Sequence, residues 1–515
     1  MSGAQASPQF GAEATTGASV VRGGLWKMFS NALPQLYALT LSIAAARYLG
    51  PDDMGRQSFI AFAEILTIEV ISSGLAMAAQ RYIGEAVGAR RGAQARWLAL
   101  TIFKIELVGA AIGGGVLIAL GLHGQEPQAA WILAGVAAVS GVLATVPGAV
   151  LSGLQRWRDA TIAGLATGGF GTVATLVVLA VGGRITAMFA VEAVSLSIAF
   201  LWTGLLARRA LPAVADTVER EPELRRRTLR FAAYSSVGAL LTLIVWRRSE
   251  FFFLNHYSAD REIAFYSIAF AVVSALVRLP SAMGQVLAPA VATLFGAGAH
   301  ERIRRGFSRA LRLLLIATIP IVAASAALGP ETLKLIWGDA YAPTRDPFLI
   351  MVAASLLTPM TVTAASLLAG LGRVRVPLVV NTCAGAVDLG LAYLLVPHHG
   401  AVGAAIANAG AQATAGIPLI ASCSRLAGPI RWGPGSLLRC AVYSALGGVA
   451  AWAVVSALGG LIGIVLGLLA GLTLFLGLAS TIGLLHRDDA DWLAAVVGSK
   501  LGNAPRRLVL ALAVR

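Results

Sequence analysis

The stretch that decides the fold is FAAYSSVGALLTLIVWRRSEFFFLNHYSADREIAFYSIAFAVVSALVRLPSAMGQVLAP (residues 231–289), in which two long apolar runs flank a polar break at 255–262. The first run contains the polar cluster Arg247, Arg248, Ser249 and Glu250, and the second contains a lone cation, Arg278, near its middle. A charged side chain at bilayer depth costs about 2.5–3.5 kcal/mol on insertion scales, so such charges persist where they face a wet cavity or a partner. The stretch therefore predicts a helical hairpin that forms half the lining of a polar pathway.

The composition is that of a membrane protein. The chain is 57% hydrophobic and 13% charged, whereas soluble domains are about 25% charged, and its mean hydropathy is +0.77. The net charge of +15 would suggest a nucleic-acid partner in a soluble chain. Here the arginines lie in short loops between apolar runs, so we expect membrane lipids, and no nucleic acid, as the partners of this charge.

Apolar runs long enough to cross about 30 Å of hydrocarbon recur along the chain. They predict an all-α polytopic membrane protein with about fourteen transmembrane helices. We expect a disordered cytoplasmic tail (1–24), an N-terminal six-helix bundle (25–206), a cytoplasmic linker (207–230), a C-terminal six-helix bundle (231–425), two accessory transmembrane helices (426–485) and a cytoplasmic or interfacial tail (486–515). Outside the hairpin, the spans are expected near 25–49, 59–80, 97–122, 129–152, 160–182, 185–206, 307–329, 347–370, 376–396, 400–424, 437–458 and 461–485.

The Lys and Arg residues predict the orientation of the chain. They concentrate in alternate loops, at 81–96, 156–158, 208–230, 302–309, 373–375 and 425–439, while the loops between these are poor in cations. Cytoplasmic loops carry the excess of Lys and Arg in membrane proteins. Because the alternation holds through all the loops, we expect an even number of spans and both termini in the cytoplasm.

An internal repeat divides the chain into two halves. SGLQRWR (152–158) recurs as AGLGRVR (369–375), and YLGPDDMGRQSFIAFA (48–63) recurs as HYSADREIAFYSIAFA (256–271). Six spans separate the equivalent positions, and an even number keeps the same orientation in the membrane. The sequence therefore predicts two parallel-repeat six-helix bundles related by an axis along the membrane normal.

Several segments carry a family resemblance: AARYLGPDDMGRQSF (45–59), GLAMAAQRYI (74–83), VPHHGAVGAAIANAGAQ (396–412) and the hairpin junction at 247–271. They resemble the Wzx-type polysaccharide and O-antigen precursor flippases of the multidrug/oligosaccharidyl-lipid/polysaccharide (MOP) exporter superfamily, over about 25–485. The resemblance implies a MATE-like fold whose two bundles enclose a cavity. It further implies that polyprenyl-pyrophosphate-linked oligosaccharide, a lipopolysaccharide precursor, is moved across the bacterial inner membrane by alternating access. Fourteen spans also resemble the lipid II flippases of the same superfamily, so a lipid II-type flippase is an alternative function.

The polar residues of the spans give the candidate site. Arginine suits a pyrophosphate because its planar donors meet phosphate oxygens bidentately, which makes Arg247, Arg248 and Arg278 the candidate anion contacts. Asn31 and Gln35, one turn apart, are candidates for hydrogen bonds to sugar hydroxyls. The alternative for the arginines is an ion pair or an interface anchor, and for the amides it is interhelical hydrogen bonding.

Acidic residues of the spans are the candidates for ion coupling, and we name Glu69, Glu64, Glu250 and Asp388. With an offset of 209 residues, which aligns Tyr48 with Tyr257, Arg278 falls on Glu69; this would place the two opposite each other if their helices face a common cleft. The alternative for these carboxyl groups is a local structural role. We expect no organic cofactor and no metal site; a proton or sodium gradient and the removal of product by glycan assembly are both open as energy sources.

Two other functions must be distinguished from that of a flippase. A MATE-like multidrug or cation antiporter would share the fold but should present a cavity dominated by carboxylates, unlike the arginines of the hairpin. A polytopic glycosyltransferase or polymerase needs a large outer segment for its catalytic site, and none is present, so we expect no enzyme activity. Polysaccharide polymerase and other glycan assembly proteins are the expected protein partners of a flippase.

Overall fold

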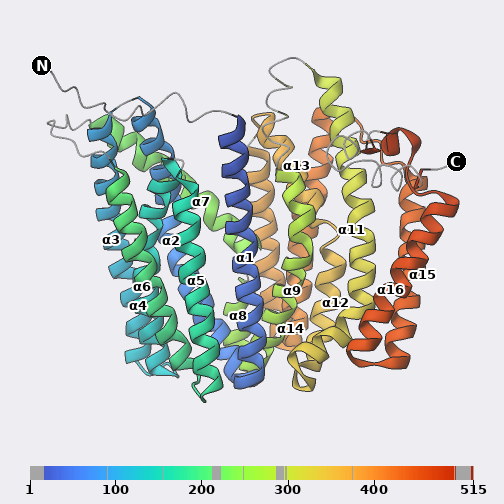
Figure 1. Cartoon of the computed structure of the whole chain (residues 1–515), viewed down its shortest axis with the longest axis horizontal. Helices are drawn as coiled ribbons and strands as arrows, with labels where there is room; N and C mark the ends of the chain where they lie inside the picture. The colour runs from blue at the N-terminus through green and yellow to red at the C-terminus, as the bar shows by residue number, and fades with distance from the viewer. Residues whose placement is uncertain are drawn as a thin grey trace, which may run out of the picture. The chain divides into compact units, whose positions relative to one another are not determined.

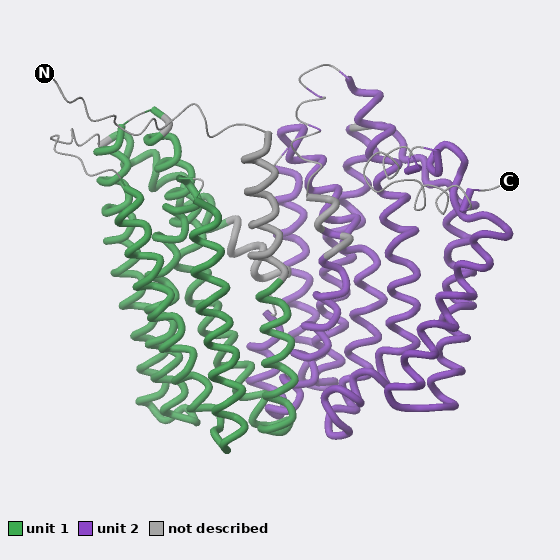
Figure 2. Tube along the Cα trace, viewed as in Figure 1, with its two compact units in different colours: residues 1–240 green, residues 241–515 purple. Residues whose placement is uncertain are grey.

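The computed structural model describes residues 17–89, 91–154, 156–211, 222–246, 249–285, 291, 295, 299–373, 375–491, 493–494 and 512–513. The chain divides into two compact units, residues 1–240 and 241–515, which Figure 2 shows in different colours. Within the described residues the secondary structure is helical apart from one isolated bridge between Leu485 and Ala513. The all-helical class expected from the sequence is therefore confirmed.

Unit 1 is a bundle of long helices. They are α1 (Gly17–Leu49), α2 (Pro51–Gly88), α3 (Gly92–Leu122), α4 (Gln128–Gly153), α5 (Trp157–Ala180), α6 (Ile185–Ala210) and the first part of α7 (Pro222–Trp246). The central helix is α4, which packs against α2, α3 and α6 (Figure 1). Its inward face is built from small residues that are fully buried, namely Ala130, Ala134, Ala137 and Ala138. Small residues allow helix backbones to approach closely, which is the main route to helix packing in lipid.

Glycines mark the closest helix contacts of unit 1. A Cβ on Gly114 of α3 would lie 2.8 Å from the carbonyl oxygen of Gly135 on α4, and one on Gly135 would lie 2.7 Å from the Gly114 oxygen. The neighbouring Gly115 has nothing within 4 Å of such an atom. Of the glycine run 113–115, Gly114 is therefore the residue that sets the α3–α4 spacing.

Unit 2 contains the remaining helices. They are α8 (Glu250–Tyr257), α9 (Asp260–Gln285), α11 (His300–Trp337), the 3-10 helix η2 (Asp339–Thr344), α12 (Arg345–Ala354), α13 (Thr358–Gly370), α14 (Arg375–Ala427), α15 (Pro434–Leu458) and α16 (Gly460–Ile482). The last two pack against each other, and α15 also packs on α11 (Figure 1). Apolar cores run between α11, α13 and α14 and between α15 and α16.

Helix α14 is two helices joined at a break. Gly400 has φ 50° and ψ −128°, which are not helical angles. Glu262 of α9 accepts a hydrogen bond from the Ala401 N–H at 2.9 Å, which satisfies a backbone donor that the break leaves open. The two halves correspond to the spans expected near 376–396 and 400–424.

Ten helices in the described residues are long and apolar enough to cross a membrane, which makes this a multi-pass membrane protein. The ten do not include α1, α7 or α9, and α14 counts once among them although it contains two of the expected spans. The full number of about fourteen spans stays a prediction.

The sequence repeat falls at equivalent places in the two units. Gly153 ends α4 and Gly370 ends α13, so SGLQRWR and AGLGRVR each form a turn between two helices. The second repeat pair covers the α1–α2 turn, between Leu49 and Pro51, and the α8–α9 turn, between Tyr257 and Asp260. The parallel relation of the two bundles concerns their relative placement and stays a prediction.

The ends of the expected domains differ from the helix ends. Helix α7 begins at Pro222, inside the expected linker 207–230, and α6 extends to Ala210. The described helices therefore leave only 211–221 between them. The run RRRTLR (225–230) has the charge of a loop, but arginine and leucine are both good helix formers, so the charged composition hid the N-terminal turns of α7.

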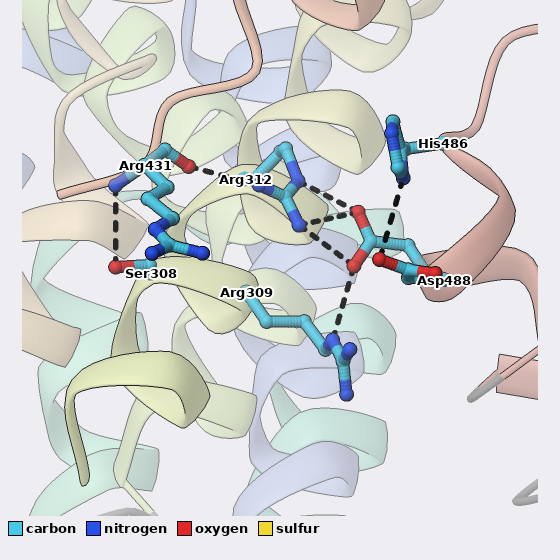
Figure 3. Close-up of polar contacts among 7 residues, drawn as sticks. Ser308, Arg309, Arg312, Arg431, His486 and Asp488 are labelled. Carbon is cyan, nitrogen blue, oxygen red and sulfur yellow. Dashed lines mark hydrogen bonds and ion pairs between the residues drawn. The ribbon is translucent and has the colours of Figure 1, made fainter. Parts of the chain in front are cut away.

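After α16 the chain returns to α11. Asp489 is 1% exposed and accepts hydrogen bonds from Arg312, with Nε to Oδ2 and Nη2 to Oδ1 both 2.7 Å, and from Arg309 Nε at 3.0 Å. Arg312 Nη1 also donates to the Arg431 carbonyl at 2.8 Å, and Figure 3 shows this contact among the dashed lines that start from Arg309 and Arg312. This part of the expected tail 486–515 is thus attached to unit 2 by a buried charge cluster.

Candidate functional site

Two buried carboxyl groups lie in the interior of unit 2. Glu250 is the first residue of α8, Asp388 lies in the first half of α14, and each is 0% exposed. The position of Glu250 in the first turn of a helix is favourable for a negative charge, because unpaired N–H groups give that end a partial positive charge. Buried carboxylates nevertheless need hydrogen bonds or a cation to compensate for lost hydration.

A chain of hydrogen bonds extends from Glu250 across three helices. Asn408 Nδ2 donates to Glu250 Oε1 at 3.0 Å, and Gln412 Nε2 donates to Asn408 Oδ1 at 2.8 Å. Thr358, at the start of α13, donates its hydroxyl to Gln412 Oε1 at 2.8 Å. This series of hydrogen bonds joins α8, α13 and the second half of α14, so a change in the charge of the Glu250 carboxyl group can affect all three helices.

Asp388 is bound by Ser249, the residue that precedes Glu250. Ser249 Oγ donates to Asp388 Oδ2 at 2.6 Å, and the Asp388 carboxyl group lies within electrostatic range of Glu250. The second oxygens, Glu250 Oε2 and Asp388 Oδ1, receive no hydrogen bond from the described part of the protein. Two buried carboxyl groups within electrostatic range of each other favour a proton on one of them or a cation between them. The arrangement can therefore bind a proton or a small monovalent cation.

Acidic residues of unit 1 form fewer hydrogen bonds in the described structure than Glu250 and Asp388 do. Glu106 of α3 is 0% exposed and accepts a hydrogen bond from Thr145 of α4. Glu64 of α2 is 2% exposed and lies within electrostatic range of Glu192 on α6, and no described group donates to its Oε2. Glu69, on the same helix, is half-buried and engaged with other groups. Glu64 and Glu192 are therefore a second close pair of acidic groups, with fewer hydrogen bonds than the pair in unit 2.

The candidate anion contacts are not brought together by the described structure. Arg278 lies on α9 with an exposed side chain and interacts with other groups of the protein. Arg247 and Arg248 lie outside the described residues. The predicted opposition of Arg278 and Glu69 joins unit 2 to unit 1, so it stays a prediction.

The amide candidates lie on α1. Gln35 is half-buried, and Pro34 beside it is exposed within the helix. Asn31 belongs to the same helix, but its side chain lies outside the description. The hydrogen bonds of Asn31 and Gln35 to sugar hydroxyls therefore stay a prediction.

Four members of the unit 2 network were missed by sequence reasoning: Ser249, Thr358, Asn408 and Gln412. A signal for two of them is present, because Asn408 and Gln412 are one helical turn apart in the otherwise apolar segment AIANAGAQATAG (405–416) and so share a helix face. Amides in such a position are expected to bond to a neighbouring helix. The sequence does not identify the neighbour.

Features that would indicate catalysis have structural roles. Asp53, which with Asp52 forms an acidic pair in the first turn of α2, forms ion pairs with Arg184 and, at 3.7 Å, with Arg56, and so ties α2 to the start of α6. The rings of His398 and His399 lie near each other at the break in α14. Among the described residues there is no group of three His, Cys, Asp or Glu side chains that could hold a metal ion.

Two family models match the sequence. The model described as polysaccharide biosynthesis protein matches residues 20–295, which is more than half of the chain, and the MatE model matches 223–394. A Shigella flexneri protein named "Putative O-antigen transporter" is 21% identical over 413 residues, which cover 75% of this chain and 94% of the relative.

Solved structures with the same fold come from two kinds of transporter. An inward-facing multidrug resistance MATE family transporter of the MOP superfamily has a TM-score of 0.66 at 16% identity, over 76% of this chain and 94% of its own. The lipid II flippase MurJ in an inward closed conformation has a TM-score of 0.67 at 12% identity, over 89% of this chain and 98% of its own. At these identities the likeness concerns the fold.

Proposed function

This chain belongs to the polysaccharide biosynthesis protein family of MOP-superfamily transporters, and we propose that it moves a polyprenyl-pyrophosphate-linked oligosaccharide across a bacterial inner membrane. The family is one of transporters and not of enzymes. The observation that carries the proposal is the match to the family model over residues 20–295. The O-antigen transporter relative, aligned over 94% of its length, supports a precursor of a surface polysaccharide as the transported molecule.

The substrate needs two environments at once. Its pyrophosphate and glycan must be shielded from hydrocarbon, while its polyprenyl tail can stay in lipid. We assign the contacts with the pyrophosphate to Arg278 and to Arg247 and Arg248, because guanidinium groups bind phosphate oxygens bidentately and stay charged. Asn31 and Gln35 of α1 are assigned to the sugar hydroxyls. Alternating access between the two sides of the membrane would then move the headgroup.

The unit 2 network is our candidate for energy coupling. Glu250 and Asp388 are buried, lie within electrostatic range of each other, and each has one oxygen that no described donor reaches. Binding or release of a proton or monovalent cation there would change the charge at the start of α8 and the hydrogen bonds that lead to α13 and α14. Glu64 and Glu69 of unit 1 are secondary candidates. The proton or cation gradient that drives transport would act through ion binding at this network, and no organic cofactor would be needed.

A second function has one specific observation in its favour. The MatE model matches residues 223–394, which contain both carboxyl groups of the network. A cation-coupled multidrug antiporter would use the same carboxyl groups. Efflux of a cationic dye from cells that express the chain would support the antiporter, and its absence together with glycan export would support the flippase.

A deletion strain tests the proposal. Loss of the chain is expected to remove the surface polysaccharide and to trap its lipid-linked precursor on the cytoplasmic side of the membrane. Both effects should be restored by the wild-type chain supplied in trans. Normal surface polysaccharide in the deletion strain, without trapped precursor, would contradict the proposal.

A further inference from the structure

A groove of about 980 Å³ lies in unit 1 between the N-terminal parts of α3 and α7. Trp97, Leu100 and Lys104 contribute from α3, and Arg225, Arg226, Leu229 and Arg230 contribute from α7. It is distinct from the candidate transport site, because none of the substrate or coupling candidates named above lines it.

The groove concentrates positive charge. Lys104, Arg225, Arg226 and Arg230 are all exposed, and no carboxylate within the described ranges forms an ion pair with any of them. Glu106, the acidic residue nearest in sequence to Lys104, is buried and bonded to Thr145 instead. By contrast, Arg227 of α7 lies over the ring of Tyr82, and Arg81 of α2 lies over the ring of Phe231. The cations of the groove thus keep their capacity to bind an anion.

The groove also has an apolar wall. Leu100 is 53% exposed, and Leu229 and Trp97 are half-buried beside it. Long Lys and Arg side chains reach toward a headgroup while their stems lie on apolar surface, and tryptophan is enriched at the level of lipid headgroups. A ligand that is anionic at one end and apolar at the other fits this lining.

The position along the helices places the groove at the membrane surface. Helix α3 has 31 residues, about 46 Å at 1.5 Å per residue, and so exceeds the about 30 Å of hydrocarbon. Its first turns, which carry Trp97, therefore lie at headgroup level, on the face where the Lys- and Arg-rich loops predict the cytoplasm. Anionic lipids of the cytoplasmic leaflet are attracted by basic clusters, and basic pockets between transmembrane helices bind lipid head groups.

We propose that this groove binds an anionic glycerophospholipid of the cytoplasmic leaflet, with its phosphate on the four cations and an acyl chain along Leu100 and Leu229. The apolar wall formed by Leu100 and Leu229 favours a lipid over a soluble anion such as inorganic pyrophosphate, which has no apolar part to place there. The inference does not rest on the proposed transport function.

Binding of phosphatidylglycerol to the purified, delipidated full chain tests the site. A lipid titration followed by native mass spectrometry compares the wild type with Lys104→Gln/Arg225→Gln/Arg226→Gln/Arg230→Gln. The matched control, Arg208→Gln/Arg209→Gln/Arg302→Gln/Arg373→Gln, removes four exposed cations elsewhere. We expect binding to weaken at least about tenfold in the groove variant and to stay within about twofold of the wild type in the control.

Parallel titrations identify the occupant. Zwitterionic phosphatidylcholine and soluble inorganic pyrophosphate are expected to bind the wild type more weakly than phosphatidylglycerol. Equal binding of phosphatidylglycerol to the wild type and the groove variant, or equal losses in both variants, would overturn the site. Tighter binding of a polyprenyl pyrophosphate than of phosphatidylglycerol, lost in the groove variant, would overturn the assigned occupant.

A variant with only two substitutions tests whether the loss of lipid binding is caused by misfolding. Arg225→Gln/Arg226→Gln changes only two exposed side chains near the start of α7 and is expected to melt at the wild-type temperature while still losing phosphatidylglycerol. Undiminished binding by this folded double variant would also count against the groove.

Discussion

Ser249 Oγ lies 2.6 Å from Asp388 Oδ2 and joins residues 139 positions apart in the chain. The contact ties the start of α8 to the first half of α14, while Asn408 ties Glu250, the next residue, to the second half. Two adjacent residues thus connect both halves of a helix that is broken at Gly400. An ion bound between Glu250 and Asp388 would act on both halves at once.

The network predicts that Glu250→Gln abolishes coupled export without unfolding the protein. Glutamine keeps an oxygen that can accept from Asn408, but it cannot carry the negative charge that holds a proton or cation. We expect glycan export to fall at least about tenfold, measured by surface polysaccharide in the deletion strain, with normal abundance in the membrane. Glu85→Gln, an exposed change on α2, should export normally. Export by Glu250→Gln at the wild-type level would remove Glu250 from the coupling site.

Arg278 is predicted to contact the transported anion. Arg278→Ala should abolish glycan export while membrane abundance stays normal, because the guanidinium group is lost from α9. Arg278→Lys should restore part of the activity, since lysine keeps the charge but not the bidentate geometry. The control is Arg261→Ala, an exposed change at the outer start of the same helix. Wild-type export by Arg278→Ala would contradict the assignment.

The C-terminal attachment depends on Asp489. In Asp489→Asn the charge that two arginines share is lost, and hydrogen bonds to a charged group contribute about 1.5–3 kcal/mol. We expect residues after 483 to become more accessible to protease and the melting temperature to fall by several degrees. Asp491→Asn removes an exposed charge two residues away and should change neither measurement. Equal protease resistance of the two variants would show that the carboxylate does not hold the segment.

Helix spacing in unit 1 depends on Gly114. In Gly114→Val the added Cβ would meet the Gly135 carbonyl oxygen at 2.8 Å, and such overpacking costs about 1–3 kcal/mol. Thermal unfolding in detergent should show the loss. Gly115→Val places the same side chain where nothing lies within 4 Å and should melt near the wild-type temperature. Similar melting of both variants would contradict the packing described here.

Local signals made much of the fold predictable. The turns at Gly153 and Gly370 were located from the sequence because a helix end in lipid needs polar residues and glycine in a short segment, and both are visible there. The break in α14 at Gly400 lies between the two spans that were expected near 376–396 and 400–424. The helical start of α7 was not predicted, because its arginines resemble those of a loop.

The candidate site was predictable only in part. Glu250 and Asp388 could be named because a carboxyl group in an apolar run is conspicuous. Their contact could not be predicted, and neither could the bond from Asn408 to Glu250, which spans 158 positions. Such pairs are decided by which helix faces meet, and the short-range pattern of apolar residues does not specify that.

Reconstituted translocation is the most direct measurement of the central claim. The purified chain in proteoliposomes would be given a polyprenyl-pyrophosphate-linked oligosaccharide, and the glycan that becomes accessible to a membrane-impermeant glycosidase would be followed over time. We expect wild-type protein to expose the glycan from the protected leaflet, and the Arg278→Ala and Glu250→Gln variants not to do so. Exposure no faster than in protein-free vesicles, by folded wild-type protein supplied with proton and sodium gradients, would contradict this expectation.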